Sequence, residues 1–362
     1  MLVNHRKYII PVFLGKMIIL LYILFYFIAL FAEELPAEKK KYLVMLICFI
    51  LALLAGTRDF TWPDTEAYFD NFQYYTPSFK NLTPSSRPNG FTEMGFYYLG
   101  VIVKSCTNNV TVYFLFVSFF TFYYLYKIFN KYCLYPLLGI CTYISRFYMG
   151  RNFMQIRAGL AYAMVVFGIK YITNRDWKRY FAIVFVASLF HSSALIAVPL
   201  YFLCLLKVKK IHIVIGLAMA FAISIFYSNV IMLMIENRAS DMNVETYIED
   251  EYLREFGLSN PMIYFQLFIL IVYTFAENRM KLTSEHYYTI RNAYFYSTFI
   301  LISLSCYTAL SGRTSSLFAT LEVVIIPSLA FSFFRNIRWV AYLGMALAIS
   351  IIFYLNMIKF NI

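Results

Sequence analysis

The chain has 362 residues, of which 61% are hydrophobic, 20% aromatic and only 14% charged. A soluble domain carries about 25% charged residues, so this composition excludes a soluble globular protein and indicates an all-α polytopic membrane protein. The apolar runs are continuous rather than alternating, which argues against a membrane β-barrel. The net charge of +12 comes from Lys and Arg in short links beside these runs, a pattern of membrane topology and not of nucleic-acid binding.

Hydrophobic runs of the length that crosses a bilayer, about 17–25 residues, recur along the chain. We predict a single integral membrane domain over 1–362, with about 10–12 transmembrane helices once a broken segment is included. The simple candidate spans are 8–31, 42–57, 110–126, 133–149, 153–172, 211–235, 261–277, 293–310, 314–334 and 338–358. The first run is too long for the core of a signal peptide, so we expect a membrane helix there.

Two long polar linkers interrupt the spans. The first covers 57–92, and the second, 236–260, holds seven acidic residues against two arginines. Placing both outside leaves the short basic links inside, as the positive-inside rule requires. We therefore predict a large external loop at 57–92 and an acidic external loop at 236–260, with one amphipathic helix from about 243 to 256.

Two segments do not fit a simple crossing. Segment 93–105 is too short to span and should lie at the outer face or dip into the membrane. Segment 179–206 has basic links at both ends, so both ends should face the cytoplasm. We expect two helical arms that break near His191, with the break buried in protein because lipid cannot satisfy freed backbone groups.

Arginines gather near the predicted outer boundary, where the charge rule disfavours them. They are Arg58, Arg87, Arg146, Arg151, Arg157, Arg238, Arg254 and Arg313. Guanidinium groups stay charged and grip phosphate in a bidentate way, and the external phosphate at membrane depth is a lipid-linked pyrophosphate. We favour this role for Arg151 and Arg157, which can converge on one anion at a helix start if Arg151 lies in a loop. The alternative is snorkelling or pairing with Asp59, Asp64, Glu66 and Glu93. For Arg238 and Arg254, which lie in the acidic linker, we favour pairing at the surface.

His191 lies at the predicted break, in the sequence SLFHSSAL. A neutral histidine there can act as a general base or hydrogen-bond a sugar hydroxyl. The alternative is a buried histidine that is satisfied by a backbone carbonyl freed at the break. The sequence leaves both interpretations open.

The stretch 55–72 leaves the membrane with aromatic and acidic side chains. Trp62 and Tyr68 can form an interfacial belt or a stacking platform for sugars. Asp64 can accept a hydroxyl proton or cap a short helix. Glu93, at the start of the short segment 93–105, has the same two interpretations.

Motifs for nucleotide binding, zinc proteolysis and serine hydrolysis are missing, and so is a cytoplasmic DxD motif. Six cysteines lie mainly in or beside apolar runs without paired spacing: Cys48, Cys106, Cys133, Cys141, Cys204 and Cys306. We expect membrane-core thiols rather than disulfides, and we predict neither a metal site nor a cofactor.

Three blocks then occur in a characteristic order. They are Gly56-Thr57-Arg58 with Asp64 and Tyr68, Gln155-Ile156-Arg157-Ala158-Gly159-Leu160-Ala161, and Phe190-His191-Ser192-Ser193-Ala194. With the helix pattern, they resemble the EpsG-like, Wzy-type polymerases of bacterial polysaccharides such as O-antigen, over most of the chain. Trp62 stands where the family usually has Gly, Ala158 stands where many members have Gln, and Arg313 fits a late family arginine more loosely.

The resemblance implies a glycosyltransferase-C-like membrane fold and a membrane glycosyltransferase that is active at the periplasmic face of the bacterial inner membrane. Such an enzyme moves a growing glycan from undecaprenyl pyrophosphate onto the sugar of another undecaprenyl-pyrophosphate-linked repeat unit. Membrane lipids, a chain-length regulator and a flippase are the other expected partners. We expect no nucleic acid and no cofactor.

The resemblance and the residue chemistry together assign three groups of site residues. The catalytic group that activates or orients the acceptor hydroxyl is His191 and Asp64; the pyrophosphate-binding group is Arg151, Arg157, Arg58 and Arg313; the acceptor-sugar group is Glu93, Trp62 and Tyr68.

Two other classes stay open. A repeat-unit flippase or transporter would more often show two related halves and charges that line a midplane cavity, which this sequence does not show. A membrane O-antigen ligase or an acyltransferase using His191 would differ in its product.

Overall fold

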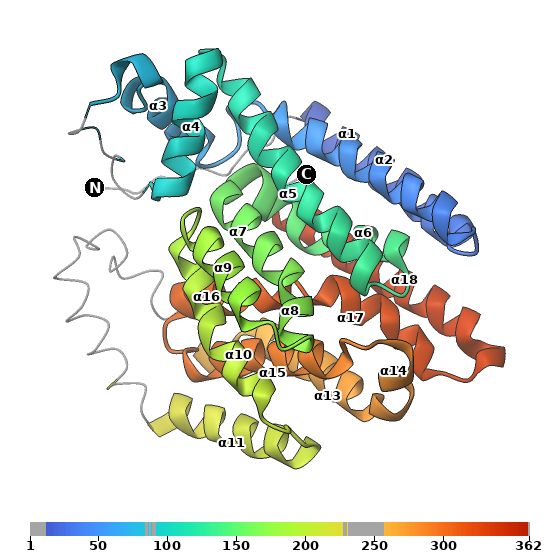
Figure 1. The fold of residues 1–362 in the computed structure, drawn as a ribbon. Coiled ribbons are helices and arrows are strands. Elements are labelled where there is room, and N and C mark those ends of the chain that lie inside the picture. The colour runs from blue at the N-terminus through green and yellow to red at the C-terminus, as the bar shows by residue number, and fades with distance from the viewer. Residues whose placement is uncertain are drawn as a thin grey trace. The chain divides into compact units, whose positions relative to one another are not determined.

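The computed structural model describes residues 12–226 apart from 84, 85, 87 and 89–91, together with residue 230 and residues 257–360. Every regular element within these ranges is helical, which confirms the predicted all-α class (Figure 1). The predicted helix at 243–256 and the arginines Arg87, Arg238 and Arg254 lie outside the described residues. The prediction of one domain over the whole chain stays a prediction.

The chain groups into two compact units. The first is made of Met1–Phe167, Ala182–Ala194 and Glu322–Ile362, and the second of Gly168–Phe181 and Leu195–Leu321. Helix α9 (Trp177–Ser188) contributes to both.

The first unit is built around α5. Its helices are α1 (Val12–Ala32), α2 (Ala37–Gly56), α3 (Thr65–Asp70), α4 (Met94–Cys106), α5 (Val110–Tyr132), α6 (Pro136–Tyr143), α7 (Ile156–Phe167), α17 (Glu322–Ser328) and α18 (Arg338–Lys359). The Asn109 side chain caps α5 by accepting the N–H of Thr111. Helices α2 and α7 both pack on α5 (Figure 1). A Cβ at Gly56 would lie 2.8 Å from the Leu115 Cα, so this glycine lets α2 and α5 approach closely.

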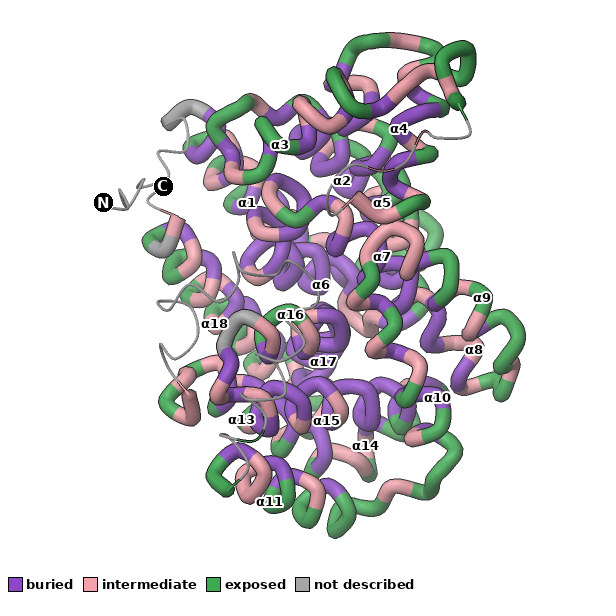
Figure 2. The backbone as a smooth tube through the Cα atoms, turned by 90° about the vertical axis from the view of Figure 1, so that its left-hand side faces the viewer, coloured by how far each residue is buried: buried purple, intermediate pink, exposed green. Residues whose placement is uncertain are grey.

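The second unit is built around α15 (Tyr287–Ser303), which is buried along most of its length (Figure 2). The other helices are α8 (Ile169–Thr173), α10 (Val198–Leu205), α11 (Lys210–Phe226), α13 (Pro261–Phe275), α14 (Glu277–Thr283) and α16 (Thr308–Ala319). Helices α8, α10, α11, α13, α14 and α16 all contact α15. Helices α13 and α14 are bent by 78° at the residue between them.

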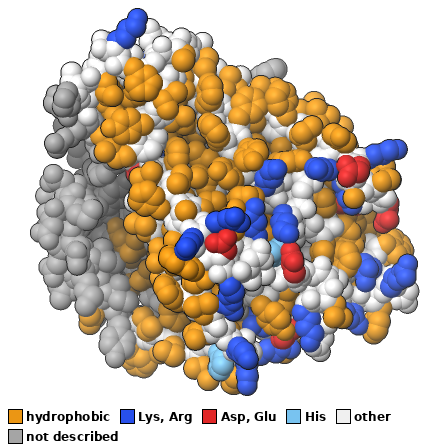
Figure 3. All heavy atoms as spheres, viewed as in Figure 1, with side chains coloured by type: hydrophobic (Ala, Val, Ile, Leu, Met, Phe, Trp, Pro, Cys, Tyr) orange, Lys and Arg blue, Asp and Glu red, His pale blue; other side chains and the backbone are white. Residues whose placement is uncertain are grey.

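Four described helices are long and apolar enough to cross a membrane, or six if each bent pair counts as one span. The four are Leu14–Ala32, Val110–Tyr132, Ile156–Thr173 and Arg335–Ile358. Many large apolar side chains are exposed, and they cover broad areas of the visible surface (Figure 3). These findings support a polytopic membrane protein. Other predicted spans correspond to shorter, bent or interrupted helices, so the total of about 10–12 stays a prediction.

The predicted helix break is confirmed. Helix α9 ends at Ser188, and the chain resumes as a 3₁₀ turn, Ser192–Ala197, that leads into α10. The amides of Phe190 and His191 both bond back to the Ala187 carbonyl, which closes the end of α9. The segment predicted as too short to span is also a short helix, the 13-residue α4.

Candidate active site

The start of α4 satisfies backbone groups that the break frees. The Gly95 N–H donates to the Leu189 carbonyl at 2.7 Å, and the Ser192 N–H donates to Glu93 Oε1 at 3.3 Å. A Cβ at Gly95 would lie 2.8 Å from the Leu189 oxygen, so only glycine allows this approach. The break is therefore tied to Glu93 and to the start of α4. Ser192 is exposed, however, and Ser188–His191 are half-buried, so the expectation that protein buries the break is not met.

Arg157, the second residue of α7, forms an ion pair with Glu93. The Arg157 and Glu93 side chains are 21% and 17% exposed, so the pair is mostly buried but reachable. The guanidinium carbon lies 5.8 Å from the ring centre of Tyr68 and 5.9 Å from that of Phe96. One contact set thus joins α3, α4, α7 and the break, which lie far apart in sequence.

His191 is held by Ser193. The Nδ1 atom lies 2.6 Å from Ser193 Oγ, and the Ser193 N–H donates to Nδ1 at 3.3 Å. Ser193 Oγ is also 3.0 Å from the Tyr162 hydroxyl. Because a backbone N–H can only donate, Nδ1 is the acceptor, and the neutral ring carries its proton on Nε2. The ring is therefore oriented to donate a hydrogen bond from Nε2.

Arg151 does not lie in a loop, so the condition under which it could converge with Arg157 on one anion at a helix start is not met. It belongs to a π-helical stretch, Ile144–Met154, a rare conformation that often marks functional sites. Its guanidinium lies 4.0 Å over the Phe147 ring and 5.3 Å from that of Tyr162, and the residue is 5% exposed. A Cβ at Gly159 would lie 2.6 Å from the Arg151 carbonyl oxygen, so this glycine lets α7 pack against the π-helical stretch.

Arg58 is a buried cation with unused donors. Its Nη1 donates to the Phe153 carbonyl at 3.1 Å, and the guanidinium stacks 4.4 Å over Phe114. Its Nε and Nη2 are buried and have no hydrogen-bond partner within the described ranges. Burial lowers the pKa of Arg58 to about 10, which leaves it charged at neutral pH.

Trp62 and Thr65 carry two more buried polar groups, and the Thr65 N–H donates to the Trp62 carbonyl at 3.3 Å. The Trp62 ring stacks on Phe153 at 4.4 Å, so Trp62 and Arg58 share this neighbour. The buried Trp62 Nε1 and Thr65 Oγ1 also find no hydrogen-bond partner among the residues described. Buried donors in proteins are nearly always satisfied, so a group of unsatisfied donors marks a place for a ligand rich in acceptors.

Asp64 does not cap α3 with its side chain, so the structural alternative considered for it is wrong. It is an exposed residue in the left-handed conformation, with φ of 63°, immediately before α3. A non-glycine residue in this conformation is strained, and such strain clusters at functional sites. Burial raises the pKa of the neighbouring Tyr68, and the charge of Arg157 partly opposes that rise. Glu93 makes no side-chain cap to α4 either.

The first unit brings together most of the predicted site residues. They are Arg58, Trp62, Asp64, Tyr68, Glu93, Arg151, Arg157 and His191, whereas Arg313 lies on α16 of the second unit.

Sequence reasoning missed the contact between Arg146 and Glu322. Arg146 Nε lies 2.8 Å from an oxygen of the fully buried Glu322. An acidic residue inside the hydrophobic run 314–334 was the available signal, because a buried carboxylate needs a partner.

A cavity of about 690 Å³ lies between the linker 57–92 and α4, and sequence reasoning also missed it. The rings of Tyr74, Tyr75 and Phe79 line it, together with the Lys104 side chain. Lys104 Nζ donates to the carbonyls of Phe72 and Gln73 at 2.7 and 2.6 Å, which fixes the loop to α4. The wall also includes Tyr97, whose buried hydroxyl has no partner in the part of the chain described. Exposed rings beside polar groups suit a saccharide.

The fold and the site define a polytopic membrane protein with an arginine-rich polar cluster. Residues 41–362 match the model of the EpsG family, and the chain belongs to that family. This confirms the resemblance seen in the sequence. Neither a curated protein nor a solved structure matches the chain. Family membership suggests a polysaccharide-polymerase type of role and a membrane glycosyltransferase.

Proposed function

We propose that this chain polymerises lipid-linked oligosaccharide repeat units. The acceptor sugar hydroxyl attacks the anomeric carbon of the donor glycan, a new glycosidic C–O bond forms, and the bond to undecaprenyl pyrophosphate breaks. The donor-rich region around Arg58 is the single observation that supports this most strongly. The N–H groups on the two unsatisfied guanidinium nitrogens of Arg58 and the Trp62 N–H need acceptors, and pyrophosphate oxygens supply them.

In this mechanism the arginines stabilise the charge that develops on the leaving pyrophosphate. Arg58 supplies unused donors, and Arg157 and Arg151 supply positive charge from α7 and the π-helical stretch. Loss of one well-placed donor of this kind costs on the order of 100-fold to 1,000-fold in rate. Arg313 is a further candidate that the second unit would have to supply.

His191 orients the acceptor hydroxyl through its Nε2–H, because Nδ1 is engaged with Ser193. We assign the proton released by that hydroxyl to Asp64, which is exposed and does not cap α3. Glu93 is less suited to this task because Arg157 and the Ser192 N–H occupy its oxygens. Glu93 instead positions Arg157 and, with Trp62 and Tyr68, shapes the acceptor side.

The proposal also covers the setting of the reaction. We place the active face at the periplasmic side of the bacterial inner membrane, in a glycosyltransferase-C-like fold. The cavity beside Tyr74, Tyr75 and Phe79 would hold sugars of a repeat unit. A chain-length regulator and a flippase are the protein partners that we expect for such a reaction.

The test is the length of surface polysaccharide, on a gel, from cells with Arg157→Ala or His191→Ala at matched protein level. Arg335→Ala removes an exposed arginine elsewhere and serves as the control. We expect a ladder to collapse to single-repeat glycan in the two site variants only. Loss of all surface glycan would favour a flippase or ligase, and an unchanged ladder would refute the assigned site. Altered acylation at unchanged chain length would favour an acyltransferase.

A further inference from the structure

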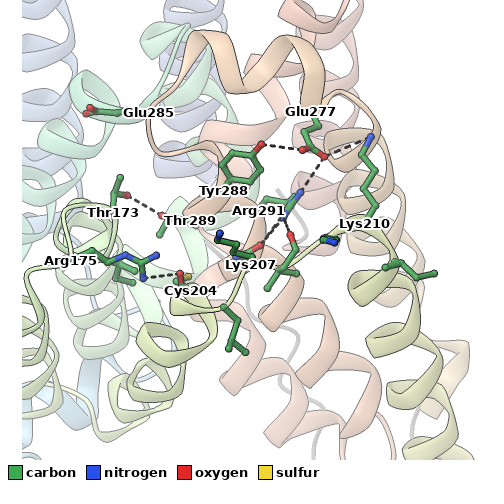
Figure 4. Close-up of a pocket in the computed structure, with 16 residues that line it drawn as sticks. Thr173, Arg175, Cys204, Lys207, Lys210, Glu277, Glu285, Tyr288, Thr289 and Arg291 are labelled. Carbon is green, nitrogen blue, oxygen red and sulfur yellow. Dashed lines mark hydrogen bonds and ion pairs between the residues drawn. The ribbon is translucent and has the colours of Figure 1, made fainter.

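The second unit contains a separate cavity of about 720 Å³ that the proposed reaction does not use (Figure 4). Five cationic side chains line it, against two carboxylates. They are Arg175, Lys207, Lys209, Lys210 and Arg291, with Glu277 and Glu285. The wall therefore carries an excess of positive charge.

The two carboxylates are already engaged. Glu277 accepts the Tyr288 hydroxyl at 3.1 Å and pairs with Lys210 at 3.7 Å and Arg291 at 3.5 Å (Figure 4). Glu285 lies 3.0 Å from a ring nitrogen of His286. Neither carboxylate pairs with the lysines of the link between α10 and α11, and the described ranges offer those lysines no ion-pair partner.

Arg291 holds that link in place. Only 1% of this residue is exposed, and its Nη2 donates to the Val208 carbonyl, while Nε donates to Asn292 Oδ1 at 3.4 Å. Val208 stands between Lys207 and Lys209, so a buried, fixed guanidinium anchors the backbone that carries both lysines. The two ammonium groups are thus presented at the cavity by a rigid support rather than by a loose loop.

Arg175, another of the five cationic side chains, adopts a costly backbone conformation. It has φ of 58° at the second residue after α8, directly after the C-cap Asn174, where glycine is the usual choice. The amide of Asp176 bonds to the Tyr171 carbonyl at 2.8 Å and that of Arg175 to the Ile172 carbonyl at 3.0 Å, the pattern of a Schellman motif. Arg175 Nη1 donates to the Cys204 carbonyl at 3.0 Å, which directs its side chain along the cavity wall (Figure 4).

We propose that this cavity binds a phosphate group, carried by an anionic phospholipid headgroup or by free phosphate. Basic pockets between membrane helices on the cytoplasmic side suit such headgroups. The charge rule places the link between α10 and α11, which carries Lys207 and Lys209, on that side. The proposal does not depend on the polymerase reaction.

The test uses the full-length purified protein and two probes: inorganic phosphate, and phosphatidylglycerol in mixed micelles with phosphatidylcholine micelles as reference. Binding is read by native mass spectrometry and by the shift in unfolding temperature. The site variant is Lys207→Gln with Lys209→Gln, and the matched control is Lys39→Gln with Lys41→Gln. The control removes two exposed lysines from the first unit.

We expect the site variant to bind about 30-fold more weakly, since each lysine near an anionic surface contributes roughly fivefold. The control pair should bind like the wild type. Saturation by phosphatidylglycerol alone identifies a lipid ligand, and competition by phosphate identifies the free anion; either upholds the proposal. Equal weakening in both variants, or no binding to the wild type, overturns it.

Arg175→Gly separates binding from folding. Glycine suits the left-handed backbone position, so this variant should unfold at a higher temperature than the wild type. It also removes one cation, so it should bind the anion about fivefold more weakly. A variant that is more stable yet binds as tightly as the wild type would show that Arg175 is not part of the site and contradict this assignment.

Discussion

Replacing Glu93 by Gln should strengthen the binding of inorganic pyrophosphate while impairing polymerisation. The Ser192 N–H and Arg157 contact different oxygens of Glu93, and Gln keeps only one of them, so the replacement removes the negative charge together with one acceptor. That charge competes with any phosphate for Arg157, so its removal frees the guanidinium for the ligand.

The size of the effect follows from Coulomb's law. A phosphate that contacts the Arg157 guanidinium on the side away from Glu93 would lie roughly 6 Å from the Glu93 carboxylate, given ordinary hydrogen-bond lengths. At an effective dielectric constant of about 20, two such charges repel by about 3 kcal/mol. The side chains are 21% and 17% exposed, so solvent screening lowers this. We expect about 1.4 kcal/mol, or tenfold tighter binding.

The assay is calorimetric titration of the purified protein with pyrophosphate at low and at high salt. The control is Glu66→Gln, which removes an exposed carboxylate from α3. We expect a tenfold gain for the Glu93 variant that shrinks at high salt, and no more than a twofold gain for the control. Unchanged or weaker binding by Glu93→Gln would falsify the assignment of Arg157 as a phosphate ligand, leaving the ion pair a purely structural role.

Three further outcomes are expected. Gly159→Ala should destabilise the protein by about 1–3 kcal/mol through overpacking, and it should lower activity. Gly150→Ala, which has open space around its Cβ, should do neither. Unfolding in detergent measures the difference in stability. Burial raises the pKa of Glu33, so the folded state holds that proton more tightly than the unfolded state does. Stability should therefore fall as pH rises above the ordinary value of 4.5. Glu33→Gln should flatten this dependence of the unfolding temperature on pH. Arg58→Met should raise the unfolding temperature and abolish polysaccharide growth. A variant that unfolds at a lower temperature and also loses polysaccharide growth would contradict the role of Arg58 as a ligand donor.

The sequence predicted the helix break but not the contacts that stabilise it. Basic links at both ends of 179–206 required the break, and its position near His191 followed from the polar residues there. The bond from Gly95 to Leu189 joins residues 94 positions apart, and no periodic pattern encodes such a partner. Single-sequence patterns report local preference, whereas these bonds arise from tertiary packing.

Sequence reasoning named Glu93 among four carboxylates that could pair with the outer arginines, but it did not specify Arg157 as its partner. The π-helical stretch around Arg151 was invisible as well, because its apolar spacing resembles that of an ordinary helix end. The left-handed conformations of Asp64 and Arg175 ran against residue preference. Local preference fails at these positions, and each of them lies at a polar cluster.

The arginines near the predicted outer boundary looked alike in the sequence, and their contacts now separate them. Arg146 is matched by Glu322, and Arg157 by Glu93, so much of their charge is used within the protein. Arg58 has no such carboxylate among the described residues, and two of its donors are unsatisfied. Each unsatisfied buried donor costs about 1–3 kcal/mol, which a structural arginine would have no reason to incur. An acceptor-rich ligand recovers that cost only when bound, which makes Arg58 the arginine best prepared to discriminate the pyrophosphate-bound state from the empty one.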